Sequence, residues 1–177
     1  MEKRCFISIE LPENVKKEIK KIRDSLPEFI GKNTEVQNLH LTLKFLGEID
    51  NDKIEKVREK IRKIDFKKIN CEIDEIGFFS PKFIKIIWIH LSGAEELQKS
   101  IDNSLLDLFE KEERFMSHIT IARIKSVKNK KIFLEELKKI KFNKIDFPAD
   151  RFYLMESELR KEGPEYKIIE FFGEKYN

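Results

Sequence analysis

Hydrophobic and polar positions recur along the chain with two different periods. Stretches in which apolar and polar side chains alternate predict half-buried strands, whereas apolar spacings of three and four residues predict amphipathic helices. The segment that Pro12 opens, for example, carries Val15, Ile19 and Ile22 on one helical face. These patterns predict strands over residues 4–11, 39–46, 70–78, 83–91, 117–124, 151–159 and 166–172, and helices over residues 12–26, 52–64, 94–110 and 131–140.

Two of the predicted strands contain the same short motif. Residues 40–43 are His-Leu-Thr-Leu and residues 118–121 are His-Ile-Thr-Ile, although the chain of 177 residues has only three histidines and three threonines. Random placement would produce such a repeat on the order of one time in a thousand, so this motif is more specific than most short motifs. Because alternate strand residues share a face, each histidine lies beside its threonine, and the aliphatic residues face a core.

The paired motif suits acid–base chemistry on a phosphate. Histidine titrates near neutral pH, so one imidazole can accept a proton while the other donates one. The hydroxyls of Thr42 and Thr120 can donate hydrogen bonds to anionic oxygens. Phosphodiester cleavage fits best, because the charge on its non-bridging oxygens requires preorganised donors. His40 and His118 are therefore the candidate catalytic residues, and no Cys, Asp or Glu lies near them at metal-ligand spacing.

Two basic residues follow the motifs. Arg123 lies five positions after His118, and in a regular strand this odd offset places it on the opposite face. It reaches a phosphate only if the strand ends, twists or bulges near Ala122. Lys44 lies four positions after His40 and has the parity to supply positive charge instead. For Lys44, an ordinary solvated surface position is an equally good interpretation.

The spacing of the motifs suggests two related halves. The motif histidines are 78 residues apart, and an amphipathic helix follows each motif strand. No linker rich in Pro, Gly or Ser divides the chain. We therefore expect two similar α+β halves around one shared cleft, within a single bilobal domain that spans residues 1–177.

Composition narrows the class of protein. A formal net charge of +3 does not indicate a strongly basic nucleic-acid binder, and no apolar run approaches the length of a membrane span. Cys5 and Cys71 belong to no metal-ligand spacing and are expected to be buried. The strand-like pattern starts at Arg4, which argues against a signal peptide and makes a cytoplasmic location the expectation. His90 has no threonine two residues later and is interpreted as a structural or surface histidine.

The motifs and their surroundings resemble the 2H phosphoesterase superfamily. Within it, the chain looks like the bacterial and archaeal RNA 2′,3′-cyclic phosphodiesterases, historically called 2′-5′ RNA ligases or LigT-like proteins. The similar segments are the first strand, the two motifs and the C-terminal hairpin, at residues 4–12, 38–48, 117–123 and 154–166. Two positions depart from the family pattern: Ser117 stands where the family often has Pro, and residues 34–36 lack a common Trp.

The resemblance implies an α+β fold of two pseudo-symmetric lobes of antiparallel sheet, with helices packed outside and a central active-site cleft. It implies hydrolysis of RNA 2′,3′-cyclic phosphate ends to a 2′-phosphate, without metal or other cofactor. His40 and His118 would be the acid–base pair, and Thr42, Thr120 and Arg123 would hold the phosphate. The sequence does not fix which histidine is the acid; the assignment favoured here is His40 as the acid on the leaving O3′ and His118 as the base on water.

The expected partners are RNA ends or cyclic nucleotides, bound by a monomer that has no membrane association. Aromatic rings in the cleft would stack on bases. Phe115 is one candidate, although a core position is favoured because the chain has 15 phenylalanines. Two alternatives remain open: a 2′-5′ RNA ligase acting on ends like those of tRNA halves, and a non-catalytic module that binds RNA ends.

Overall fold

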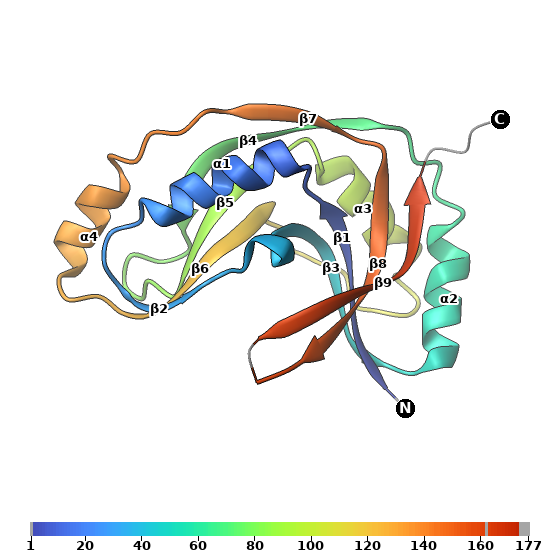
Figure 1. The fold of residues 1–177 in the computed structure, drawn as a ribbon. Helices are drawn as coiled ribbons and strands as arrows, with labels where there is room; N and C mark the ends of the chain where they lie inside the picture. Colours follow the sequence, from blue (N-terminus) through green and yellow to red (C-terminus); the bar gives the residue numbers. More distant parts are fainter. Residues whose placement is uncertain (1, 162, 174–177) are drawn as a thin grey trace.

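The structure is a computed structural model and describes residues 2–161 and 163–173 (Figure 1). Its strands are β1 (Lys3–Glu10), β2 (Ile30–Asn33), β3 (His40–Ile49), β4 (Ile69–Phe78), β5 (Ile86–Ser92), β6 (His118–Ser126), β7 (Ile145–Ala149), β8 (Arg151–Leu159) and β9 (Pro164–Gly173). Its helices are α1 (Glu13–Asp24), α2 (Asn51–Ile61), α3 (Glu95–Ser104) and α4 (Lys130–Leu137), with a short 3₁₀ turn η1 (Val36–Asn38). Each predicted element has a counterpart among them.

The strands form two antiparallel sheets. Sheet A has the order β3-β1-β8-β9, and sheet B has the order β2-β6-β5-β4-β7. With the four α-helices of the described residues, this arrangement confirms the predicted α+β class with two antiparallel sheets. The motif strands β3 and β6 lie next to each other where the two sheets meet (Figure 1).

The two sheets exchange strands between the two halves of the chain. In sheet A, β1 lies between the motif strand β3 and β8, which comes from the C-terminal half. In sheet B, β5 lies between the motif strand β6 and β4, which comes from the N-terminal half. Each motif strand thus has the same place beside a central strand. A single residue, Asp150, separates β7 of sheet B from β8 of sheet A.

The helices bury the apolar faces that the periodicity predicted. Buried on the first three helices are Val15, Ile19, Ile22, Ile54, Val57, Ile61, Leu97 and Ile101. They belong to one continuous core cluster that includes residues from both sheets. Asp50 begins α2 as an N-cap, since its side chain accepts a hydrogen bond from the Lys53 amide at 2.8 Å. Among the described residues, no helix is long and apolar enough to cross a membrane.

Two strands of sheet B were not predicted. β2 is exposed over its four residues, so it shows no alternation of buried and exposed positions. It lies close to β6 because Gly31 has no side chain: a Cβ there would lie 2.1 Å from the carbonyl oxygen of Arg123. β7 contains Pro148, which weakens a strand prediction. Both are edge strands whose existence depends on the partner strand.

The helix predicted over residues 94–110 ends earlier, at Ser104. The Leu105 amide donates to the carbonyl of Asp102 at 3.2 Å, and the Leu108 amide donates to that of Leu105 at 2.9 Å. These three-residue turns keep the apolar spacing that a helix would have, so periodicity alone could not locate the end. The chain then runs through a loop to β6.

Candidate active site

The paired motif lies on one face of each motif strand. His40 and Thr42 are partly exposed on β3, and His118 and Thr120 are partly exposed on β6. The aliphatic residues beside them are buried: Leu41, Leu43, Ile119 and Ile121. This alternation confirms the predicted division of each strand into a core face and a polar face. The two polar faces together are called the paired-histidine site below.

Each motif strand contains a β-bulge at the same place after its threonine. The β1–β3 ladder skips Leu43, and the β5–β6 ladder skips Ile121. One extra residue reverses the side to which the following residues point. The next residue is therefore buried in both strands, Lys44 in β3 and Ala122 in β6. The residue after it returns to the polar face.

Arg123 reaches the polar face of β6 because of this bulge. It is exposed, whereas its neighbour Ala122 is fully buried. Burial lowers the pKa of His118, and the charge of Arg123 lowers it further. The same charge acts on Tyr166 of β9, where it opposes the rise in pKa that burial causes. Arg123 therefore lies near His118 and Tyr166, on a face that it could not reach from a regular strand.

Lys44 does not face the paired-histidine site. The bulge turns it inward, where its ammonium group forms an ion pair with Asp102 of α3 and donates a hydrogen bond to the carbonyl of Glu110 at 2.9 Å. The two paired side chains are only 5% and 4% exposed. The prediction from strand parity is therefore wrong, and so is the solvated-surface interpretation. Parity holds only in a strand without a bulge.

Phe45 occupies in β3 the place that Arg123 occupies in β6. Each lies five residues after its motif histidine and directly follows the buried residue of the bulge. The Phe45 ring is 67% exposed. The two motif strands thus contribute an aromatic ring and a guanidinium group at equivalent positions of the site.

The same backbone contact fixes both imidazoles. Nδ1 of His40 lies 2.8 Å from the carbonyl oxygen of Asn38, and Nδ1 of His118 lies 2.7 Å from that of Met116. In this arrangement a neutral ring donates from Nδ1, so Nε2 is the basic nitrogen. Each ring therefore keeps Nε2 for proton transfer.

Burial favours the neutral form of both rings. It lowers the pKa of His40 to about 4, with smaller contributions from the charges of Lys16 and His118. Burial is also the main cause of the lowered pKa of His118. The two rings come from β3 and β6, which contact each other. The structure thus brings together the two histidines that the motif singled out.

The two motif threonines differ in their contacts. Oγ1 of Thr42 lies 3.0 Å from Nε2 of His40. With the ring neutral and Nδ1 protonated, the hydroxyl is the donor. Within residues 2–161 and 163–173, the hydroxyl of Thr120 makes no comparable contact with His118. One hydroxyl is thus committed to its own histidine, and the other is available.

Comparison with known proteins decides the family. A family model described as LigT-like phosphoesterase matches residues 9–88 and 91–166, which include both motifs. The chain belongs to the LigT-like phosphoesterase family. Membership confirms the resemblance that the motif segments indicated.

Relatives of this family member match it over nearly their full length. The RNA 2′,3′-cyclic phosphodiesterase of Methanocaldococcus jannaschii is 35% identical over 173 residues, which is 94% of this chain and 98% of the relative. That of Thermotoga maritima is 32% identical over 175 residues, covering 94% and 92%. The crystal structure of E. coli LigT complexed with 3′-AMP matches with a TM-score of 0.82, covering 99% of this chain and 100% of that chain. At 20% identity, that likeness shows a shared fold.

Aromatic rings contact both histidines of this LigT-like protein. The ring of His40 lies 4.9 Å from Phe6 and 5.1 Å from Tyr166, between centroids. The ring of His118 meets Phe79 edge-to-face at 4.9 Å. Phe79 is 50% exposed, so it can contact a ligand as well. Phe79 and Tyr166 are distant from the motifs in sequence, and no local pattern marks them as neighbours of the histidines.

Phe115, the aromatic candidate from the sequence, is partly buried and packs against the hydrophobic core. The favoured interpretation of Phe115 as a core residue is therefore confirmed. His90 lies opposite His118 in the β5–β6 ladder, a relationship that the sequence interpretation missed. Pairing register between strands that are distant in sequence leaves no signal in either strand alone.

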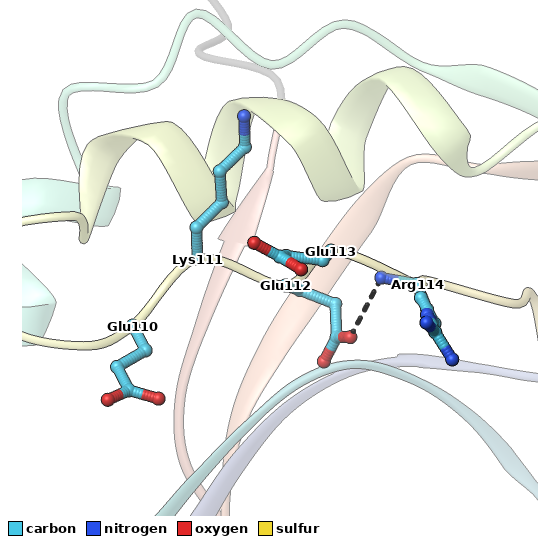
Figure 2. Close-up of a pocket in the computed structure, with 5 residues that line it drawn as sticks. All are labelled: Glu110, Lys111, Glu112, Glu113 and Arg114. Carbon is cyan, nitrogen blue, oxygen red and sulfur yellow. Dashed lines mark hydrogen bonds between the residues drawn. The ribbon is translucent and has the colours of Figure 1, made fainter.

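A surface pocket lies apart from this site, in the loop before β6 (Figure 2). It is lined by residues 110–114, and the Arg114 amide donates to the Glu112 carboxylate at 3.3 Å. In Figure 2 the Lys111 side chain extends toward α3, whereas Glu110 points the other way. Neither motif histidine lines this pocket, and three carboxylates do, so it is poorly suited to an anionic substrate.

Proposed function

We propose that this protein hydrolyses RNA 2′,3′-cyclic phosphate ends to 2′-phosphates, as one bilobal domain over residues 1–177. The observation that carries the proposal is the pair of histidines from two strands, in each of which a backbone carbonyl holds Nδ1 and leaves Nε2 as the basic nitrogen. Family membership and the activity named for the relatives support it.

His40 and His118 would act as the acid–base pair. The oxygen of a water molecule attacks phosphorus while one Nε2 takes its proton. The P–O3′ bond then breaks, and the other imidazole gives its proton to O3′. The phosphate remains on the 2′ oxygen. Each transfer by a positioned side chain contributes about 10²–10⁴-fold to the rate.

Thr42, Thr120 and Arg123 would hold the phosphate. The guanidinium of Arg123 can donate two hydrogen bonds to phosphate oxygens. The hydroxyl of Thr120 can donate directly. The hydroxyl of Thr42 has one hydrogen, and while His40 is neutral this hydrogen is donated to Nε2 of His40. When His40 is protonated, its Nε2–H donates to Thr42 instead, and the threonine can then donate to the phosphate.

The two rings differ in how strongly burial favours the neutral form. Burial lowers the pKa of His40 to about 4, which makes His40 the stronger candidate for the neutral base in the free protein. His118 would then carry the proton as the acid. This assignment reverses the roles that the sequence interpretation favours. A substrate with a good leaving group distinguishes the two assignments. Its cleavage does not need a general acid, so it restores turnover only to the variant in which the acid histidine has been removed.

The decisive experiment uses a short RNA that ends in a 2′,3′-cyclic phosphate, with EDTA present. We expect opening to the 2′-phosphate, and a loss of at least about 10²-fold in both His40→Ala and His118→Ala. Activity lost with EDTA and restored by a divalent ion would contradict the metal-independent reaction. Binding of the RNA end without any turnover by the folded protein would contradict catalysis.

A further inference from the structure

The third histidine of the chain lies beside the second motif histidine. His90 on β5 is opposite His118 on β6, and the preceding pair, Ile89 and Ile119, is fully buried. Residues opposite each other in an antiparallel pair share a face, with Cβ atoms about 4.5–5.5 Å apart. His90 therefore belongs to the polar face of sheet B, one strand away from His118.

A third bulge brings a carboxylate to His90. In the β4–β5 ladder Ile73 is opposite Leu91 and Glu75 is opposite His90, so Asp74 is the extra residue. The Asp74 carboxylate lies 2.7 Å from Nδ1 of His90. The two side chains are 23% and 29% exposed, so neither is sealed in the core. Bulges next to active sites commonly redirect a side chain in this way.

The contact with Asp74 orients the imidazole of His90. Nδ1–H donates to the carboxylate, and in the part of the chain that the structure describes, Nε2 has no hydrogen-bond partner. When the ring is protonated, Nε2 carries a hydrogen as well. A protonated imidazole donates strong, charge-assisted hydrogen bonds to phosphate oxygens.

The number of ligand groups argues against a metal here. Within the described residues, no three His, Cys, Asp or Glu side chains gather closely enough to hold a metal ion. The row from His118 through His90 to Asp74 instead crosses three neighbouring strands, which are about 4.7–4.9 Å apart. An extended RNA chain that leaves the paired-histidine site would run along this row of side chains.

We propose that His90, held by Asp74, binds the RNA phosphate on the 5′ side of the terminal nucleotide. The inference rests on the proposed function, because it takes the cyclic phosphate to lie between His40 and His118. A nucleoside 2′,3′-cyclic phosphate lacks that 5′ phosphate and cannot use the contact. His90 therefore makes the enzyme prefer an RNA end over a mononucleotide.

The test compares three substrates: a nucleoside 2′,3′-cyclic phosphate, a dinucleotide with the same cyclic end, and that dinucleotide with a neutral methylphosphonate linkage. We expect His90→Gln to reduce the kcat/KM ratio of dinucleotide to mononucleotide roughly tenfold or more. Asp74→Asn should also reduce this ratio. Asp146→Asn on β7 is the matched carboxylate control and should leave the ratio unchanged. With the methylphosphonate linkage, the wild-type protein should lose the preference.

Three outcomes would overturn the proposal. An unchanged ratio in both variants would leave His90 a structural residue. An equal loss on every substrate would mean that it acts through His118. A loss that persists with the methylphosphonate would place its contact on ribose or base.

If the wild-type protein opens no cyclic phosphate, the proposed function fails. Fluorescence anisotropy with a labelled dinucleotide 2′-phosphate then tests His90→Gln separately: tighter binding by wild type supports the site, and equal binding overturns it.

Discussion

Oγ1 of Thr42 lies 3.0 Å from Nε2 of His40, so this threonine contacts the nitrogen that would transfer the proton. Thr120 makes no comparable contact with His118 within the described residues. The hydrogen of the Thr42 hydroxyl is therefore linked to the protonation of His40, whereas that of Thr120 is not. Two threonines with the same place in a repeated motif thus differ in what they can donate to a substrate.

Removing either hydroxyl should slow the reaction. A hydrogen bond to a charged group contributes about 1.5–3 kcal/mol, so Thr42→Val and Thr120→Val should each lose roughly 10- to 150-fold in kcat/KM. Thr42→Ser and Thr120→Ser are the controls, because they keep the hydroxyl and should stay near wild type. Steady-state kinetics on a nucleoside 2′,3′-cyclic phosphate measures this. Equal activity of the Val and Ser variants would contradict a role for the hydroxyls.

The pH optimum of kcat/KM should lie on the acid side of 6.5. Turnover needs one imidazole protonated and the other neutral, and kcat/KM reports the pKa values of the free protein. Burial lowers the pKa of His40 to about 4 and lowers that of His118 as well. The form of the protein with one protonated imidazole therefore predominates between the two lowered pKa values, and its population declines as the pH rises further.

The profile of kcat should lie at higher pH than that of kcat/KM. A bound phosphodiester is an anion, which stabilises the protonated imidazoles and raises their pKa. Both profiles come from initial rates between about pH 4 and 9, with circular dichroism to confirm that the protein stays folded. A kcat/KM optimum above pH 7 would mean that the rings are not neutralised by burial.

The buried ion pair between Lys44 and Asp102 should matter for stability. Removing one partner of a buried pair leaves an uncompensated charge and costs about 3–5 kcal/mol. Lys44→Met should therefore lower the free energy of unfolding by that amount, and Lys44→Met with Asp102→Asn should recover part of it. Urea denaturation measures both. Lys20→Met, which breaks an exposed pair with Asp24, is the control and should cost less than about 1 kcal/mol.

The exposed rings of Phe45 and Phe79 should contribute to binding of a base. Base–aromatic stacking is worth about 1–3 kcal/mol per base, so each Phe→Ala variant should weaken binding of a 2′-nucleotide by roughly 5- to 150-fold. Leu106→Ala, which truncates a side chain that is 51% exposed beyond α3, is the control. Isothermal titration calorimetry gives the affinities. Affinities equal to wild type in both Phe variants would exclude stacking on these rings.

Local patterns determined most of the secondary structure. The apolar spacing of α1 and the alternation around His40 reflect which side chains must leave water, and neighbouring residues alone express that requirement. The short exposed strand β2 and the end of α3 at Ser104 escaped prediction. The first exists only because β6 is beside it, and the second continues the helical spacing in turns.

By itself, the sequence indicated the family and singled out four His and Thr residues as the candidate site, because a repeated motif in one chain is a local feature. Tertiary structure decided which other residues join them. A bulge in β6 turned Arg123 toward the site, and a bulge in β3 turned Lys44 into the core. Folding also brought Phe79 and His90 to His118. Bulges and pairing register follow from contacts between distant segments, so no single segment encodes them.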